Sequence, residues 1–328
     1  MAQHATTASA TPAAAASHDP LDRMANKAHR SLWNNAWRQF RHHHLAVTGL
    51  VIFLFFVLIT TVGSAIYPRD KEYIPMDFSL WSLAPFKSWT FPLGTDSLGR
   101  DVLARLLWGG RVSLAVGLIS AAIGVTLGTL IGAASGFFGG FLDNLLMRFT
   151  DLFIALPQVP LLLLVTFLFR DSIQSSFDRR FGNGDLGVFV LIVLVISLLS
   201  WMPTARLVRA SFLSIKEKEF VEAARSVGVS KTSIVFKHIL PNALSPIIVA
   251  GTLSVGAAII TESVLSFLGL GFPPNVPTWG RMLYEARDRL QTTPHEAMVP
   301  GTAIFLTVLA INYIGDGLRD ALDPRKTQ

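Results

Sequence analysis

The sequence contains no cysteine among its 328 residues, and only 15% of its residues are charged. The absence of cysteine excludes disulfides, thiol nucleophiles and cysteine-ligated metals. The scarcity of charge is matched by 51% hydrophobic residues and a mean hydropathy of +0.48. Such a composition indicates that the lipid bilayer, rather than water, surrounds most of the folded chain.

A nucleotide-binding motif is also missing. The string nearest to a Walker A motif, GVSKTS at residues 228–233, has serine where the motif requires the glycine directly before lysine. A loop without that glycine offers no backbone cradle for phosphates. We therefore expect that this chain is not an enzyme and binds no cofactor by itself.

The basic character of the chain does not indicate nucleic-acid binding. Its formal net charge is +6 and its sequence pI is about 9.8. The basic residues lie beside apolar runs and form no face interleaved with aromatic residues. This distribution is typical of residues that flank membrane spans, so we expect no nucleic-acid partner.

The N-terminal part divides into two segments. Residues 1–26 are rich in Ala, Thr and Ser and lack the ordered regions of a secretory signal, which predicts a disordered cytoplasmic tail. Residues 27–44 place Trp33, Trp37 and Phe40 at i, i+4 and i+7, which predicts an amphipathic helix at the membrane surface. The three consecutive histidines at its end cannot share one helix face, so we predict no metal site.

Six long apolar segments predict an all-α integral membrane protein with six transmembrane helices. The first segment, residues 45–66, carries no charge and would be about 33 Å long as a helix, close to the roughly 30 Å thickness of the bilayer core. The other five spans are predicted at residues 112–138, 152–169, 186–205, 239–268 and 297–314. Residues 67–110 are then a loop, residues 111–322 the membrane core and residues 323–328 a tail.

Orientation and kinks follow from the same segments. Six spans place both termini on one side, and the distribution of Lys and Arg weakly favours the cytoplasm for that side. Pro157 and Pro160 are predicted to kink the third span, and Pro203 the fourth.

The second span carries glycines at strict four-residue spacing. These are Gly124, Gly128, Gly132 and Gly136. Residues four apart share one face of a helix, so this face is almost bare backbone and invites close helix packing. The spacing leaves open whether the face is a static packing surface or one along which helices slide.

A half-polar stretch, residues 215–238, separates the fourth and fifth predicted spans, and we call it the elbow. Its first half has an apolar stripe at i, i+3, i+4 and i+7, formed by Phe220, Ala223, Ala224 and Val227. Gly228 stands where a helix C-terminus favours a left-handed residue, and Ser230 can cap a second helix. Two short helices joined at Gly228 are therefore predicted, either as a coupling element or as a connection lying on the headgroups.

The order of residues in the elbow resembles the EAA loop of ABC importer permeases. Residues 222–224 read Glu-Ala-Ala, Gly228 follows after three further residues, and residues 240–241 read Leu-Pro. The family pattern has isoleucine at the position of His238, and here isoleucine is the next residue. Three more motifs are similar to the peptide/nickel branch, and to its dipeptide and oligopeptide C-type subunits: FPLGTDSLGRDVLARLLWGGRVSL, SFLGLGFPP with PTWGRML, and GDGLRDALDPR.

This resemblance implies a type I ABC importer permease of the bacterial inner membrane, with residues 67–110 in the periplasm. It would form half of a pathway for dipeptides or oligopeptides beside a homologous B-type permease. Two cytoplasmic ATPase subunits would bind ATP and Mg, and a periplasmic or lipid-anchored binding protein would deliver the substrate. The elbow would dock on the ATPases, with the stripe as the docking face, Glu222 as a polar anchor and Gly228 as the turn. An ion pair of Glu222 with Arg225 is a rival role for that carboxylate.

Two groups of charged residues remain. Glu262 lies inside the fifth predicted span, where a carboxylate is costly and should face the bundle or a wet cavity. We expect it either to contact a peptide amino group or, as we favour, to make a structural hydrogen bond or lie near the outer interface. Asp96, Arg100 and Asp101 precede the second span and are expected to pair in an exposed turn, worth no more than about 1 kcal/mol, with contact to a binding protein as the alternative.

A self-contained secondary transporter of small peptides or amines is the alternative class. Such proteins show inverted repeats and paired charges at the membrane midplane. Neither is evident in this sequence, which favours the ABC permease.

Overall fold

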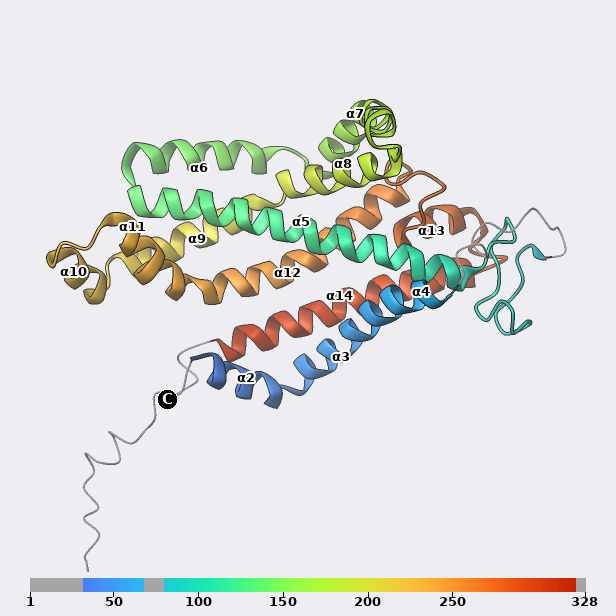
Figure 1. Ribbon diagram of the computed structural model, residues 1–328, viewed down its shortest axis with the longest axis horizontal. Coiled ribbons are helices and arrows are strands. Elements are labelled where there is room, and N and C mark those ends of the chain that lie inside the picture. The colour runs from blue at the N-terminus through green and yellow to red at the C-terminus, as the bar shows by residue number, and fades with distance from the viewer. Residues whose placement is uncertain (1–31, 68–79, 323–328) are drawn as a thin grey trace, which may run out of the picture.

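The computed structural model describes residues 32–67 and 80–322, and this part of the chain is mainly helical (Figure 1). The longer helices are α2 (Leu32–His42), α3 (His44–Leu58), α5 (Val102–Phe138), α6 (Gly140–Ala155), α7 (Gln158–Phe181), α8 (Gly184–Leu198), α9 (Trp201–Lys216), α10 (Glu219–Ser226), α12 (Leu240–Phe267), α13 (Trp279–Ala286) and α14 (His295–Ala321). The short elements are η1 (Ile59–Gly63), α4 (Ser64–Ile66), α11 (Lys231–Ser233), η4 (Ile234–Ile239) and η5 (Arg287–Arg289). Within the described ranges the only β-structure is two isolated bridges, so the predicted all-α fold is confirmed.

Four of these helical stretches are long and apolar enough to cross a membrane. They are residues His44–Ile66, Val102–Phe138, Lys231–Phe267 and His295–Ala321. Two bent pairs, α6 with α7 and α8 with α9, meet the same test when each pair is taken together. The described residues therefore provide four spans, or up to six if each bent pair is one span.

The helix α5 begins earlier than predicted. The Asp101 carboxylate accepts hydrogen bonds from the backbone N–H groups of Leu103 at 2.8 Å and Ala104 at 3.4 Å. This side chain caps the helix, so α5 starts at Val102 rather than near residue 112. The predicted loop over residues 67–110 was therefore too long, and its last turns belong to the helix.

Of the three predicted proline kinks, only the one at Pro157 lies directly at a bend of the chain. Between α6 and α7 the chain bends by 84°, because Leu156 is extended before Pro157, as the residue before a proline prefers. Pro160 and Pro203 instead occupy the first turns of α7 and α9, where a missing N–H costs nothing. The 40° bend between α8 and α9 comes before Pro203, at residues 199–200.

The glycine face of α5 packs on α9, which runs beside it in Figure 1. A Cβ atom added at Gly128 would lie 2.6 Å from the Trp201 carbonyl oxygen, and one at Gly132 would lie 2.4 Å from that of Ala205. At Gly124 the nearest atom would be the Ser200 hydroxyl, and at Gly136 the Phe212 Cβ. All four glycines are buried within this chain, an arrangement that favours static packing over sliding.

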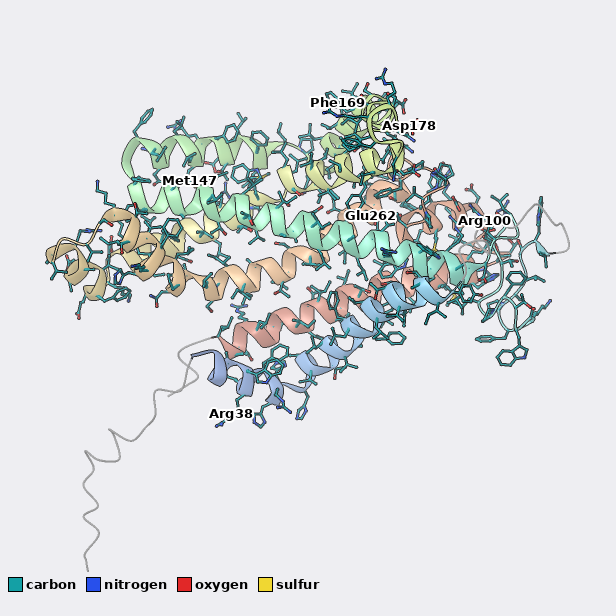
Figure 2. The ribbon with its side chains drawn as sticks, in the orientation of Figure 1. Arg38, Arg100, Met147, Phe169, Asp178 and Glu262 are labelled. Carbon is teal, nitrogen blue, oxygen red and sulfur yellow. The ribbon has the colours of Figure 1, made fainter. Side chains whose placement is uncertain are left out.

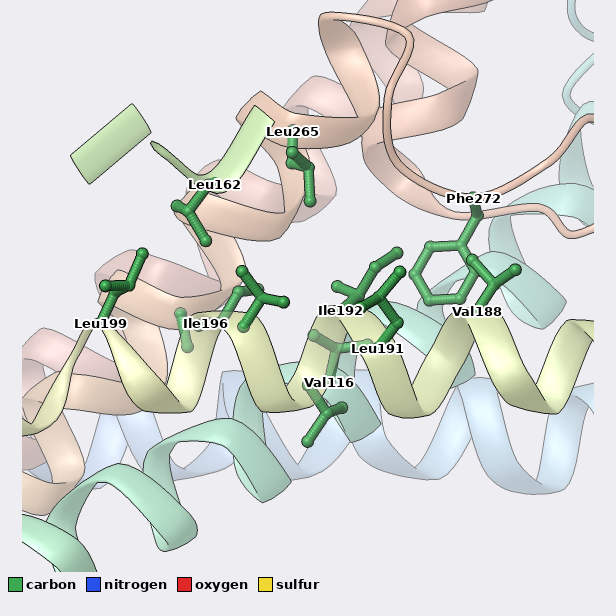
Figure 3. Close-up of a cluster of buried hydrophobic side chains, with 12 residues drawn as sticks. Val116, Leu162, Val188, Leu191, Ile192, Ile196, Leu199, Leu265 and Phe272 are labelled. Carbon is green, nitrogen blue, oxygen red and sulfur yellow. The ribbon is translucent and has the colours of Figure 1, made fainter. Parts of the chain in front are cut away.

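The central apolar core is built around α8 (Figure 3). Ile192 and Val188 on α8 are fully buried, with Val116 of α5 on one side and Leu265 and Phe272 on another. Leu194 and Leu198, on the open side of the same helix, are exposed and also apolar, as expected for a membrane helix without a polar face. This core holds α5, α7, α8 and α12 together.

The helix α2 lies beside the end of α14 (Figure 1). Phe40 is buried against Ala46 and Ala321, while Trp37 stacks on Phe40 and stays 54% exposed. The predicted aromatic stripe is thus divided between a buried and an exposed position. Of the predicted N-terminal segments, residues 1–31 lie outside the described residues, as does the tail over residues 323–328.

Candidate coupling site

The elbow forms one end of the molecule, with α10 projecting beyond the ends of the other helices (Figure 1). It connects α9 to the continuous helix that runs from α11 through η4 into α12. The opposite end carries α13 and the loop over residues 80–101, and we call it the loop end.

The turn of the elbow is held by backbone hydrogen bonds. Gly228 has φ +79°, its N–H donates to the Arg225 carbonyl at 3.1 Å, and the Val229 N–H donates to the Ala224 carbonyl at 3.0 Å. These two bonds are those of a Schellman motif. The Ser230 side chain accepts from the Ser233 N–H at 3.4 Å and caps the next helix, so the predicted helix-turn-helix geometry is present.

The apolar stripe of α10 is divided by the fold. Ala224 is buried together with Val221, and Val221 packs in the cluster that contains Phe212 and Ile234. Ala224 is therefore a packing residue here and not part of an exposed docking face, and Val221 is an anchor that the sequence pattern did not single out. A period of 3.6 residues fits both sets of positions equally well, which is why the pattern could not separate them.

Three members of the stripe remain on the surface. Phe220 is 44% exposed and Val227 is 79% exposed, and Ala223 between them is also exposed. These residues are three and four positions apart and so share one face of α10. We call Phe220, Ala223 and Val227 the elbow face.

Glu222 is exposed beside the elbow face. It forms no ion pair with Arg225 or with any other residue in the described part of the chain. The predicted intrahelical pair is therefore absent, and the carboxylate is free to meet a group outside this chain.

The elbow continues into α12 through a π-helical turn. η4 ends two residues before Pro241, whose ring would clash with a carbonyl one turn earlier in a regular α-helix. Ile234 and Ile239 of η4 are buried in the same cluster as Val221. Ile239, and not its half-buried neighbour His238, thus fills the core at this point.

Ion pairs fasten the helices that carry the elbow. Arg209 of α9 makes two hydrogen bonds to the Asp143 carboxylate of α6, at 2.5 and 2.7 Å, and Ser135 of α5 donates to the same carboxylate. Lys216 at the end of α9 donates to the Phe137 carbonyl at 2.8 Å. Side-chain hydrogen bonds and ion pairs therefore hold α5, α6 and α9 together near the elbow.

The charged residues around the start of α5 are buried or half-buried, which corrects the predicted exposed turn. Asp96 accepts from Arg100 at 2.7 Å and from Arg105 at 2.8 Å, and Glu285 of α13 accepts from the same two arginines at 2.6 and 2.5 Å. Arg281 adds a bond to Glu285 at 3.0 Å. We call these five residues the charge cluster.

The cause of this burial lies in residues that sequence reasoning missed. Arg105 is 3% exposed in its side chain, and its only visible signal was a positive charge among apolar residues at the start of α5. Burial alone would raise the pKa of Glu285, but Arg105 and Arg100 outweigh it and lower the pKa to about 2. Asp101 takes no part in the cluster; it caps α5 and accepts from the Tyr67 hydroxyl at 2.5 Å.

Glu262 is enclosed in the bundle (Figure 2). Its carboxyl group accepts from Ser113 at 3.1 Å and from Ser266 at 2.8 Å. Ser113 in turn accepts from the backbone N–H of Trp279 at 3.2 Å, and the Trp279 ring donates to the Leu106 carbonyl at 3.0 Å. This arrangement favours the structural role of Glu262, which fastens α13 to α5 and α12, over contact with a substrate.

Family profiles match both parts of the chain. The family described as binding-protein-dependent transport system inner membrane component matches residues 124–328. The family described as N-terminal TM domain of oligopeptide transport permease C matches residues 31–85.

Curated proteins match over most of their length. The glutathione transport system permease protein GsiD of Shigella flexneri serotype 5b is 41% identical over 297 residues, which cover 90% of this chain and 91% of that protein. The protein of the same name from Escherichia coli O157:H7 is 39% identical over the same shares.

A solved structure has the same fold. A chain of the MetNI methionine ABC transporter, from a study of its inward facing conformations, matches with a TM-score of 0.52 and 18% identity, over 67% of this chain and 96% of that chain. The helical fold, the two family matches and the near full-length relatives lead to one conclusion: this chain belongs to the inner-membrane permease family of binding-protein-dependent transport systems, and it is a permease subunit of an ABC importer.

Proposed function

We propose that this subunit forms half of a pathway for small peptides and that its elbow receives the motion of ATPase subunits. The observation that carries the proposal is the elbow face, an apolar surface presented by a short helix whose other side is anchored in the core. Exposed apolar side chains that share one helix face are suited to a groove on a partner protein. Glu222 beside them supplies a charged contact.

The elbow is built to move as a unit with α12. Val221 and Ala224 hold α10 against the core, and the hydrogen-bonded turn at Gly228 leaves little freedom between α10 and the next helix. Because α11, η4 and α12 are continuous, a displacement of α10 would be passed to α12. Transport would then be a shift between two arrangements of packed helices.

The remaining parts of the transporter are proposed from the family. ABC importer permeases work with a partner permease, ATPases and a binding protein. We infer a homologous B-type permease, two cytoplasmic ATPases that bind ATP and Mg, and a periplasmic or lipid-anchored binding protein. ATP hydrolysis is assigned to the ATPases. The chain is a multi-pass inner membrane protein, and we infer six spans with both termini in the cytoplasm, which places the elbow on the ATPase side.

Small peptides are proposed as the transported class. The relatives at 39–41% identity are named for glutathione transport, and glutathione is a tripeptide. The match to the N-terminal domain of oligopeptide transport permease C supports the same class.

The elbow face can be tested by adding one charge at a time. Val227→Asp and Phe220→Asp each place a carboxylate in an exposed apolar position, so the subunit should still fold while losing its ATPases. Thr232→Asp adds the same charge to an exposed position of the elbow on α11, outside the elbow face, and is the matched control. Retention of the ATPases on the purified permease, together with peptide uptake, is the measurement. Normal retention and uptake in both face variants would refute the proposed docking surface.

A further inference from the structure

A groove between α12 and α14 is not explained by the coupling site. Its volume is about 470 Å³, within the usual range for small-molecule pockets. The lining residues are Leu207, Ser245, Pro246, Val249, Ala250, Leu253, Asp316, Arg319 and Leu322. One acidic side chain, Asp316, and one basic side chain, Arg319, thus line a groove that is otherwise mainly apolar.

The groove has defined ends. A Cβ atom added at Gly315 would lie 2.7 Å from the Leu253 side chain, so α14 and α12 are in close contact there. The Ser245 hydroxyl donates to the Leu322 carbonyl at 3.2 Å, which joins the same two helices nearer the elbow. The groove is the space left between these two contacts.

The two charged groups are available to a ligand. Asp316 and Arg319 are both exposed, and neither forms an ion pair or a side-chain hydrogen bond with any other described residue. They stand three positions apart on α14, so their Cβ atoms are about 5–6 Å apart, yet they do not pair with each other. Asp316 lies toward the Gly315 contact and Arg319 toward the Leu322 contact.

We propose that this groove binds the zwitterionic backbone of a di- or tripeptide, with its ammonium on Asp316 and its carboxylate on Arg319. An extended dipeptide spans at most about 7 Å and a tripeptide about 11 Å, which fits two charges one helical turn apart when one of them is the long arginine. The apolar walls then face the peptide side chains. This assignment rests on the proposed transport of small peptides and adds the site that recognises them.

The order of the charges argues against other occupants. A phospholipid with its phosphate on Arg319 would have to pass its acyl chains beside the Asp316 carboxylate, which apolar chains do not solvate. The last six residues of the chain, DPRKTQ, include no large apolar side chain that could fill the groove. A zwitterion with apolar side groups matches both the walls and the charges.

The groove is also placed where the elbow can act on it. Its α12 wall, residues 245–253, belongs to the helical stretch that starts at Lys231 directly after the elbow turn. A displacement of α12 would change the distance between Ser245 and Leu322. The site would therefore open or close with the coupling motion.

The test measures peptide binding to the assembled transporter without its binding protein, so that delivery does not influence the result. Equilibrium dialysis uses radiolabelled glycyl-leucine, N-acetyl-glycyl-leucine and glycyl-leucinamide. Asp316→Asn should weaken glycyl-leucine and the amide about tenfold, as expected for one lost charge-assisted hydrogen bond, and leave the acetylated peptide unchanged. Arg319→Gln should weaken the two peptides with a free carboxylate and spare the amide.

Two further variants complete the design. Asp320→Asn makes the same change one residue beyond Arg319, outside the groove lining, and should bind all three peptides as the wild type does. Ala250→Trp fills the groove without a change of charge and should weaken all three.

Equal losses for charged and blocked peptides in the two charge variants would overturn the site, as would wild-type binding by Ala250→Trp. Recovery of phospholipid instead of peptide in the groove would also overturn it. If the wild-type transporter takes up no peptide, the proposed substrate class is refuted. If it takes up peptide but binds it without charge selectivity, only the assignment of this groove is refuted.

Discussion

The two ends of the molecule use polar and apolar groups in opposite ways. At the loop end the residues of the charge cluster are buried or half-buried, and every carboxylate of the cluster is paired with arginines of the same chain. At the elbow the apolar side chains of the elbow face are exposed and Glu222 has no partner in the described part of the chain. The charged groups of the loop end therefore find their partners within this chain, whereas the exposed groups of the elbow are available to another protein.

The comparison predicts that the loop end carries stability and the elbow carries coupling. Changes at the first should lower the free energy of unfolding, and changes at the second should affect transport more than folding. Three experiments test this division, and a fourth, on the contact of α5 with α9, tests the helix packing between the two ends.

The largest effect is expected for Arg105→Met. The substitution removes the more deeply buried of the two arginines that Asp96 and Glu285 share and leaves Arg100 as the only residue bonded to both. Removing one partner of a buried ion pair in this way costs up to about 3–5 kcal/mol. The thermal unfolding midpoint of the purified subunit in detergent measures the loss. Arg206→Met is the control, because its pair with Asp151 is exposed and worth about 0–1 kcal/mol; equal midpoints for the two variants would contradict a structural charge cluster.

The second-largest effect is expected from acid, which should lower the free energy of unfolding through the loop end. The pKa of Glu285 is lowered from 4.5 to about 2, so between these values the unfolded chain binds a proton that the folded chain does not. Stability from this group is complete above about pH 4.5 and is lost as the pH falls toward 2, amounting to about 3 kcal/mol. Unfolding midpoints measured from pH 6 to pH 2.5 should fall more steeply for the wild type than for Glu285→Gln, and parallel curves would exclude this linkage.

A smaller effect is expected at the contact of α5 with α9. The Cβ atom of Gly132→Ala would lie 2.4 Å from the Ala205 carbonyl oxygen, whereas that of Gly256→Ala would meet only ordinary contacts from 3.5 Å outward. Both changes gain the same helix propensity, so their difference reports the packing clash, about 1–3 kcal/mol. Similar unfolding midpoints for the two variants would show that α5 and α9 can move apart to accept the added methyl group at little cost.

The smallest effect on stability, and a clear effect on coupling, is expected for Gly228→Val. A β-branched residue with φ +79° is strained by about 1–2 kcal/mol. This strain should distort the turn and uncouple ATP hydrolysis from peptide uptake. Gly228→Asn is the matched control, because asparagine tolerates this conformation. Coupled transport in the valine variant would show that the angle of the elbow does not matter.

Most of the fold could be predicted from local signals. The all-α membrane fold, the family and the permease function were correct, and the secondary-transporter alternative was wrong. The four-residue glycine spacing of α5 correctly indicated close packing, but only the structure identifies α9 as the neighbour. The early start of α5 had a signal in the N-cap Asp101, which was interpreted instead as part of an exposed turn.

The charge cluster could not have been predicted from the same signals. Arg105 and Glu285 are 180 residues apart, and nothing in the neighbourhood of either residue identifies the other. Their burial follows from the packing of α13 on the start of α5 through Trp279. The groove between α12 and α14 has the same origin, because its two contacts join residues of different helices.

The sequence by itself determined the elements that depend on near neighbours: apolar lengths that suit a bilayer, a left-handed glycine at residue 228 and a serine cap at residue 230. Only the tertiary structure decided which side of α10 is buried, so that Ala224 packs inward while Phe220, Ala223 and Val227 face outward. The physical reason is that helix periodicity and capping are set within a few residues, whereas burial is set by whichever helix packs alongside.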